Sequence, residues 1–244
     1  MKLTKDIELI DGLPVLYIKS INALVISDMH LGYEGVIAKH TGTVLPKMNL
    51  KYIKDIINEA LTKKHATQLI VDGDIKNEFS KIDEEEFNEL LDFVKFIKEK
   101  KLLLVLIKGN HDNFVDKYKD TFKLGIFSQE ARINDYLFFH GEELPKNTEG
   151  IKMLIMGHEH PTIGIRTVGN KIERIKAFLY GKYFNIPILV IPAISYFAGG
   201  SDINLKPKSE LLSPVFKHID LDSMHAIAVG YGSTIDFGKL KDLR

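Results

Sequence analysis

Three short apolar runs alternate with two amphipathic patterns in the first half of the chain, and this alternation restricts the possible folds strongly. The runs lie at Ala23–Ser27, Gln68–Val71 and Leu102–Ile107, and they consist almost entirely of aliphatic residues. Apolar runs of this length without polar alternation are typical of strands that are covered on both faces. A strand–helix–strand–helix–strand order predicts parallel strands that are joined by helical crossovers.

The two intervening segments carry the spacing of amphipathic helices. Lys51–Lys64 repeats isoleucine, alanine and leucine along one helix face. Asp83–Lys100 has a similar apolar stripe, and its acidic start and basic end suit the helix dipole. We therefore predict a helix over each segment.

The second half predicts short strands that are separated by Gly, Asn and Pro turns, with antiparallel pairs among them. The expected strands are Tyr136–Phe139, Lys152–Met156, Ile163–Val168, Arg174–Leu179, Ile188–Ile191 and His225–Val229. The simplest interpretation is a single domain over residues 1–244 that contains two packed sheets.

Composition excludes several classes of protein and site. The chain has no cysteine, so any metal must be held by nitrogen and oxygen ligands. Lys plus Arg and Asp plus Glu are both 33, so no global basic field attracts nucleic acid. No apolar stretch approaches the roughly 20 residues of a membrane span, and the N-terminus lacks the apolar core of a secretion signal. We expect a cytoplasmic protein with no membrane partner.

Polar clusters follow five of the apolar runs, at the point where each run ends. Open α/β sheets place their functional sites at the carboxyl ends of strands. A single Asp–Gly pair is usually part of a turn, but turns alone do not account for five clusters that are rich in His and Asp. The clusters are Ser27–His30, Asp72–Asp74, Gly109–Asp112, His140–Gly141 and Gly157–His160.

Two pairs within these clusters have the spacing of chelating ligands. Asp28 and His30 are two positions apart, as are His158 and His160, and an extended segment would direct both members of a pair to one face. Mixed imidazole and carboxylate ligands suit Mn²⁺, Fe, Zn²⁺ or Ni²⁺ better than Ca²⁺ or Mg²⁺ alone. These residues indicate a metal site.

In this order, the five clusters resemble the signature of the calcineurin-like metallophosphoesterase superfamily: D-x-H, G-D, G-N-H-D/E, a single H and G-H-x-H. The longer strings SDMHLGYE, HGEELP and GHEHP resemble a branch of small phosphoesterases related to the SbcD nuclease subunit. The resemblance implies an α/β fold, a four-layer α/β/β/α sandwich of two mixed β-sheets flanked by helices.

The resemblance also implies two divalent metal ions, with Mn²⁺ as the expected ion and Ni²⁺, Zn²⁺, Fe or Mg²⁺ as alternatives. Asp74 would bridge the two ions, and a hydroxide activated by both would attack the phosphate ester. The other implied ligands are Asp28, His30 and His160 for the first ion, and Asn110, His140 and His158 for the second.

Two further residues are catalytic candidates. His111 follows a ligand position and could protonate the leaving group. Asp112 could orient His111, or it could cap the following helical turn. Asp72 has no role in the family pattern and is expected to form a turn or to support a ligand. Tyr33, Glu34, Lys76 and Tyr196 could line the cleft, although a structural role is expected for each of the four.

The expected function is a metal-dependent hydrolase, a phosphodiesterase or nuclease that acts on nucleotide or nucleic-acid phosphate esters, single-stranded nucleic acid among them. Ser/Thr protein phosphatase is disfavoured, because Ile75–Glu78 replaces the Asp-Arg-Gly element of that class. The alternative is a non-catalytic metal-binding module that partners a DNA-processing protein.

Overall fold

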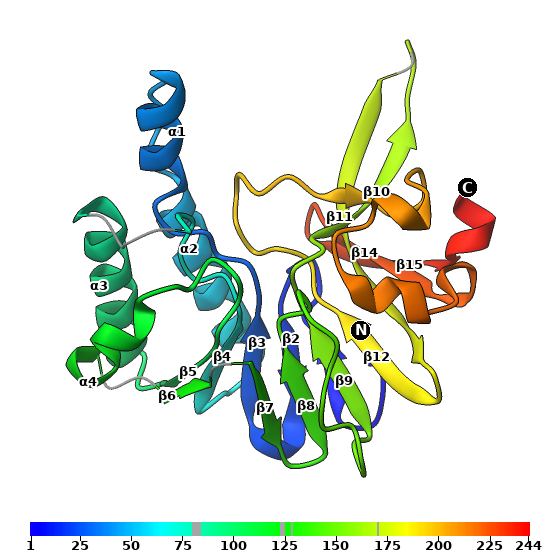
Figure 1. The fold of residues 1–244 in the computed structure, drawn as a ribbon, viewed down its shortest axis with the longest axis horizontal. Helices are drawn as coiled ribbons and strands as arrows, with labels where there is room; N and C mark the ends of the chain where they lie inside the picture. Colours follow the sequence, from blue (N-terminus) through cyan, green and yellow to red (C-terminus); the bar gives the residue numbers. More distant parts are fainter. Residues whose placement is uncertain (80–83, 123–124, 128, 170) are drawn as a thin grey trace.

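Two mixed β-sheets pack face to face, and helices cover their outer faces (Figure 1). The computed structural model describes residues 1–79, 84–122, 125–127, 129–169 and 171–244. The predicted four-layer sandwich is confirmed, and its two outer layers differ in kind. Two long α-helices cover the first sheet, whereas short 3₁₀ helices cover much of the second.

The first sheet has six strands in the order β1-β2-β3-β4-β5-β6. β1, β2 and β3 pair in antiparallel fashion, and β3 to β6 are parallel, as the alternating pattern predicted for this half. The strands are β1 (Ile7–Leu9), β2 (Leu16–Ile18), β3 (Ala23–Ile26), β4 (Gln68–Asp72), β5 (Leu103–Ile107) and β6 (Gly125–Phe127).

Both faces of the central strands are buried, which explains their continuous apolar runs. In β3, Leu24 and Ile26 face the helices, whereas Ala23 and Val25 face the second sheet. Successive side chains of a strand point to opposite faces, so a strand between two apolar layers needs apolar residues at every position. Close packing on both faces restricts movement of these strands, and therefore of the polar clusters at their carboxyl ends.

The second sheet follows the path β13-β10-β11-β12-β9-β8-β7, with β14 and β15 extending from β11. Antiparallel pairs are present as expected, while β9 pairs in parallel with both β8 and β12. The strands are β7 (Glu130–Ile133), β8 (Tyr136–Phe139), β9 (Met153–Met156), β10 (Pro161–Arg166), β11 (Ile172–Tyr183), β12 (Ile186–Val190), β13 (Ser201–Asp202), β14 (His225–Gly230) and β15 (Ser233–Lys239).

The predicted strand Arg174–Leu179 is the middle of the much longer β11. One end of β11 pairs with β10, and the other pairs with β12 and β14, so a single strand serves two parts of the sheet. Its outer residues are polar or exposed, which is why the apolar pattern marked only the centre.

The predicted helices are present, although the start of the second, Asp83, lies outside the described residues. Helix α1 was not predicted, because its buried residues are Glu34 and Gly35 and it lacks an apolar stripe. The helices are α1 (Tyr33–Thr41), α2 (Asn49–Lys63), α3 (Glu84–Glu99), α4 (Lys119–Phe122), and the 3₁₀ helices η1 (Lys19–Ile21), η2 (Val115–Tyr118), η3 (Lys208–Glu210), η4 (Pro214–His218), η5 (Leu221–Ser223) and η6 (Leu240–Leu243). Across the residues that the structure covers, every helix is too short or too polar to cross a bilayer.

Glu89 on α3 joins this helix to the loop after β3, because its Oε2 accepts a hydrogen bond of 2.9 Å from the Gly32 N–H. Burial and the nearby carboxylates of Glu34 and Glu85 raise the pKa of Glu89 to about 7. A raised carboxyl pKa favours the protonated form in the fold, so the stability that this group contributes is fully present below the ordinary pKa and is lost as pH rises through about 7.

Glu89→Gln keeps the acceptor without ionising. Its melting temperature relative to the unchanged protein should therefore rise between about pH 5 and about pH 8.

Glu99→Gln, on the exposed end of the same helix, is the matched control, and its relative melting temperature should not change over this range. A Glu89→Gln difference that stays constant with pH would contradict the prediction.

Candidate metal centre

The five polar clusters meet at the carboxyl ends of β3, β4, β5, β8 and β9. The first three strands belong to one sheet and the last two to the other, so the clusters lie where the two sheets face each other. Both sheets must therefore be in place before the clusters can form one site.

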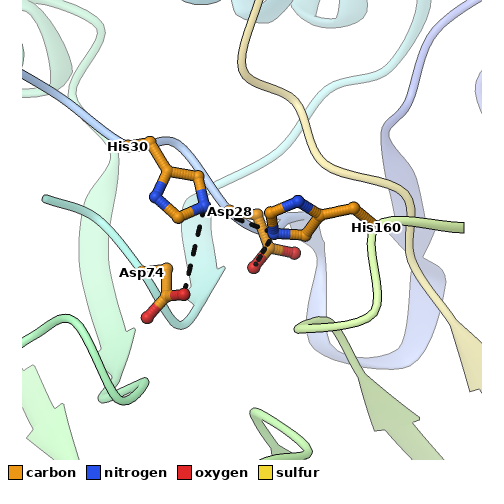
Figure 2. A group of neighbouring side chains, drawn as sticks. All are labelled: Asp28, His30, Asp74 and His160. Carbon is orange, nitrogen blue, oxygen red and sulfur yellow. Dashed lines mark hydrogen bonds and ion pairs between the residues drawn. The ribbon is translucent and has the colours of Figure 1, made fainter. Parts of the chain in front are cut away.

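One group contains Asp28, His30, Asp74 and His160, whose ligand atoms lie within 4.8 Å of one another (Figure 2). The Nε2 atoms of His30 and His160 are 3.2 Å apart, and His160 Nε2 is 3.0 Å from an oxygen of Asp28. Two imidazole nitrogens at this distance need a proton or a cation between them, because two lone pairs repel. The donors therefore fit a metal ion.

A second group contains Asp74, His140 and His158, again within 4.8 Å. His140 Nε2 is 3.1 Å from Asp74 Oδ2, and it lies 3.7 Å from Asp28 Oδ1. Asp74 thus belongs to both groups, whereas His158 and His160 fall into different ones. The i, i+2 pair His158/His160 does not converge on a single point, in contrast to Asp28/His30.

Asn110 lies in the chain between Gly109 and His111, and both of these neighbours contact the second group. The His111 backbone N–H donates to Asp74 Oδ1 at 3.0 Å, and Gly109 packs against both Asp74 and His140. Within the described chain, the buried Oδ1 of Asn110 has no hydrogen-bond partner. A buried amide oxygen without a partner is costly unless a ligand occupies it. Its surroundings therefore favour a cation.

The backbone of the ligand segments is not extended, which corrects the geometric reason given for the two pairs. Five residues have positive φ: Asp28 (56°), His30 (48°), Asp74 (51°), His158 (66°) and His160 (48°). A non-glycine residue in this left-handed region costs of order 1–3 kcal/mol and persists only where its surroundings enforce it. Sharp left-handed turns, rather than strand continuation, direct these side chains toward the site.

Backbone carbonyls fix the tautomers of His140 and His160, since a carbonyl oxygen can only accept. Nδ1 of His140 faces the Asp72 carbonyl at 2.9 Å, and Nδ1 of His160 faces that of Gly199 at 3.1 Å. Both rings therefore carry their proton on Nδ1 when neutral and present Nε2 to the site. Imidazole ligands are commonly oriented in this way.

The electrostatics of the site favour positive charge. Burial alone would raise the pKa of Asp74 and of Asp28, but the surrounding histidine rings lower both. Burial would likewise lower the pKa of His140, yet Asp74 and Asp28 raise it well above its ordinary value. By contrast, burial lowers the pKa of His30 to about 4. The two ionised carboxylates thus create a buried negative field that protons or metal ions can neutralise.

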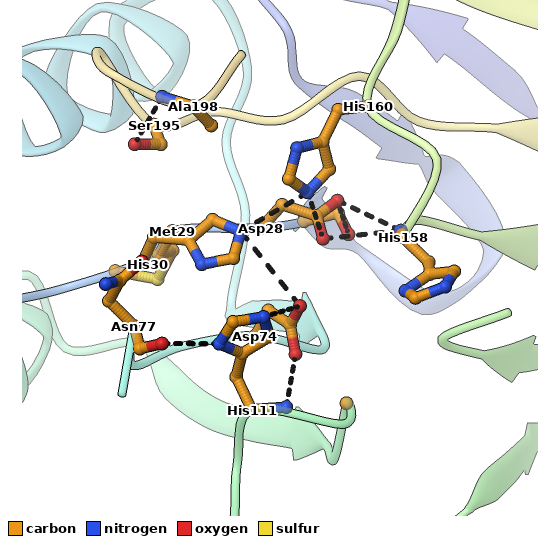
Figure 3. A network of polar contacts seen from close by, with 12 residues as sticks. Asp28, Met29, His30, Asp74, Asn77, His111, His158, His160, Ser195 and Ala198 are labelled. Carbon is orange, nitrogen blue, oxygen red and sulfur yellow. Dashed lines mark hydrogen bonds and ion pairs between the residues drawn. The ribbon is translucent and has the colours of Figure 1, made fainter. Parts of the chain in front are cut away.

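His111 lies beside the two groups, as predicted, but its expected partnership with Asp112 is wrong (Figure 3). Nδ1 of His111 contacts the carbonyl of Asn77 instead. The Asp112 carboxylate accepts from the backbone N–H groups of Gly109, at 2.9 Å, and Ile75, at 2.9 Å. Asp112 therefore braces the loops after β4 and β5 against each other. It does not cap the following turn, because Gly109 and Ile75 precede it in the chain.

Two of the four cleft candidates are buried, in line with the structural role expected for them, since Glu34 is 3% exposed and Lys76 is 1% exposed. Tyr196 is 47% exposed and belongs to a segment after β12 whose Gly199 carbonyl reaches His160. The Gly-rich sequence of this segment was the only signal of its approach. Sequence reasoning missed the supporting role of Asn77, because the group it provides is a backbone carbonyl.

The sequence of residues 21–161, more than half of the chain, matches the model of the calcineurin-like phosphoesterase family. The chain therefore belongs to this family, which implies a metal-dependent phosphate-ester hydrolase. No curated protein matches the chain.

Of three solved structures compared with this chain, one shares its fold. Nuclease MPE from Pseudomonas putida superposes with a TM-score of 0.63 at 19% identity, covering 94% of this chain and 100% of that one. The phosphoesterase Yfce from E. coli gives a TM-score of 0.41 at 17% identity, covering 73% and 83%. A protein of unknown function from Aquifex aeolicus gives 0.38 at 21% identity, covering 57% and 78%.

Gly157 leaves no space for a side chain at the start of the last cluster. A Cβ atom there would lie 1.8 Å from the hydroxyl oxygen of Ser27, whose single proton is shared between an Asp28 carboxylate oxygen at 2.7 Å and the Asp72 carbonyl oxygen at 2.6 Å. We expect Gly157→Ala to lower the stability of the metal-free protein by about 1–3 kcal/mol, as overpacking does. Denaturant unfolding with chelator present measures the change.

Gly125→Ala is the matched control, because its Cβ would meet only ordinary contacts at 3.8 Å. Equal stability of the two variants would refute the crowding argument.

Proposed function

We propose that the chain is a two-metal phosphodiesterase or nuclease that hydrolyses nucleotide or nucleic-acid phosphate esters. The observation that carries the proposal is the pair of ligand groups that share Asp74. Two ions held by a common carboxylate suit in-line displacement at phosphorus, because such a pair clamps both the attacking and the leaving oxygen.

The proposed ligand sets follow the two groups. Bound divalent ions would lower the pKa of a water molecule and neutralise charge on the phosphoryl oxygens. Mn²⁺ is the proposed ion, because it accepts the mixed imidazole, carboxylate and amide donors present here. The sets are Asp28, His30, Asp74 and His160 for one ion, and Asp74, Asn110, His140 and His158 for the other.

His111 is the proposed proton donor. Because Nδ1 is held by the Asn77 carbonyl, the ring presents Nε2 toward the site, 3.9 Å from Asp74 Oδ2. In its imidazolium form, Nε2 donates a proton to the leaving-group oxygen. The Asp74 carboxylate also accepts from the His111 backbone N–H, so the residue is held at two points.

Aromatic rings beside the site favour a substrate that carries nucleobases. The ring of Phe79, 54% exposed, lies with its centroid 3.7 Å from that of His111. Tyr33 and Phe197, in the two segments that adjoin His30 and Gly199, are half-buried and stack on each other at 5.4 Å, so Phe79 offers the more exposed ring. Exposed aromatic faces bind unpaired bases by stacking, independently of sequence. Single-stranded nucleic acid is therefore the substrate that we propose.

Removal of a shared or second-site ligand tests the catalytic proposal. Asp74→Asn and Asn110→Ala should each reduce Mn²⁺-dependent hydrolysis of bis(p-nitrophenyl) phosphate by more than about 100-fold, the upper end of what losing a mere supporting partner costs. Asp135→Asn is the control, since its carboxylate pairs with Lys152 in the turn between β7 and β8, at the opposite end of β8 from His140. Unchanged rates in both ligand variants would exclude the proposed centre.

The alternative is a non-catalytic metal-binding module that acts with a DNA-processing protein. The family resemblance motivates this alternative, whereas a pure binding module has no need of His111. Zero net charge also gives the chain little long-range attraction for DNA on its own. A purified protein that binds two Mn²⁺ ions, yet cleaves neither aryl diester nor single-stranded DNA, would favour the module.

Phe79→Leu tests the stacking role. Loss of one stacked base costs about 1–3 kcal/mol, so KM for a short single-stranded oligonucleotide should rise by about 5- to 150-fold. Cleavage of an abasic oligonucleotide of equal length should change little, because it offers no base to the ring. Phe184→Leu removes an exposed ring from the turn between β11 and β12, and it serves as control. An equal loss on both oligonucleotides would assign Phe79 to the support of His111 instead.

A further inference from the structure

Asn49, the first residue of α2, is fully buried and uses all the hydrogen-bonding capacity of its side-chain amide. Nδ2 donates to the carbonyls of Met29, at 2.9 Å, and His30, at 3.0 Å. Oδ1 accepts from the Ser195 hydroxyl, at 3.1 Å, and from the Tyr196 N–H, at 2.8 Å. An amide has two N–H donors and two acceptor lone pairs, so nothing remains unpaired.

The helix itself does not require this amide. Oε1 of Glu34 accepts from the backbone N–H groups of Met48 and Asn49, both at 2.9 Å, and thus satisfies the start of α2. A carboxylate at this end also suits the helix dipole. An asparagine that begins a helix usually caps it, whereas all four bonds of the Asn49 side chain go to other segments. Its conformation therefore serves tertiary structure.

The two segments that Asn49 joins belong to different sheets. Met29 and His30 follow β3 of the first sheet, whereas Ser195 and Tyr196 follow β12 of the second. Figure 3 shows the Ser195–Ala198 stretch alongside Met29 and His30, and Figure 1 shows the loop after β12 reaching toward α2.

The second segment continues to a metal-ligand candidate. Its Gly199 carbonyl accepts from Nδ1 of His160, and the Ala198 N–H donates to the Ser195 hydroxyl at 3.3 Å. Lys176 on β11 donates to the Ser195 carbonyl at 2.6 Å and so fixes the Ser195–Ala198 turn to the second sheet. The Asn49 amide thus donates directly to the His30 carbonyl. On its acceptor side it holds Ser195, and the Gly199 carbonyl that orients His160 follows four residues after Ser195.

We propose that Asn49 is a positioning residue that holds the His30 and His160 rings at the separation a metal ion requires. This inference rests on the proposed function, because it assigns these two histidines to one ion. His30 has a left-handed backbone, with φ of 48°, and such a conformation needs external bonds to persist. The Asn49 amide provides one of them directly at the His30 carbonyl.

Asn49→Asp is the sharpest test, since it is nearly isosteric and replaces only the two donors. One carboxylate oxygen, in the place of Nδ2, would then face both the Met29 and the His30 carbonyl, whereas the other would still accept from Ser195 and Tyr196. We expect affinity for Mn²⁺ at the His30/His160 site to fall by about 10- to 100-fold, while affinity at the His140/His158 site is retained. Isothermal titration with Mn²⁺ measures both, and His30→Ala identifies which binding phase belongs to the first site.

Asn204→Asp is the matched control. Asn204 is also buried, at 7% exposure, and its amide bonds to Gly164 and Leu243, away from both ligand groups. The control should lose stability without losing Mn²⁺ affinity at either site. Equal losses of affinity in the two variants, or an unchanged first site in Asn49→Asp, would overturn the positioning role.

If the unchanged protein binds no pair of Mn²⁺ ions, the proposed function fails before Asn49 is tested. If Asn49→Asp does not fold, Ser195→Ala decides, because it removes the hydroxyl bond to Asn49 together with the bond from the Ala198 N–H and leaves the Tyr196 N–H in place. A several-fold loss confined to the first site then supports the role, and unchanged affinity refutes it.

Discussion

Two buried carboxylates, those of Asp28 and Asp74, join the two sheets, and the arrangement of the site depends on them. Each comes from the first sheet and interacts with histidine from the second: Asp28 with His160 and Asp74 with His140. A buried carboxylate is costly unless charge and hydrogen bonds compensate it. The two sheets therefore pack correctly only when the site is also assembled, because either carboxylate without its histidine partner would destabilise the fold.

The same requirement accounts for the backbone conformation of the clusters. To reach a point between the sheets, the chain must leave its strands abruptly, and it does so through left-handed turns at residues such as His30 and His160. These conformations are unfavourable by themselves and are stabilised by bonds from outside each turn. The His158 backbone N–H, for example, donates to the Asp28 carboxylate at 3.2 Å. The carboxylates thus hold backbone as well as rings.

The sequence predicts the parts of this structure that repeat a local pattern. The alternating runs identify β3, β4 and β5, and their continuous apolar character predicts burial on both faces, as the split of Ala23 and Leu24 between two cores confirms. The family resemblance identifies which clusters converge. Helix α1 was missed because its buried residues are Glu34 and Gly35, which carry no apolar signal. The long strand β11 was recognised only around its apolar centre, because its first residues are exposed and its last four, Tyr-Gly-Lys-Tyr, carry no continuous apolar run.

Partners that act through their backbone leave no trace in the sequence, and this explains the remaining errors. The carbonyls of Asp72, Asn77 and Gly199 face Nδ1 of three site histidines, yet any residue offers a carbonyl. Assigning Asp112 to orient His111 followed from the frequency of carboxylate–imidazole pairs, but the short turn aims the Asp112 side chain back at backbone N–H groups. Side-chain identity therefore predicts which atoms can bind a metal ion, whereas long-range backbone contacts determine which nitrogen of each ring is available to it.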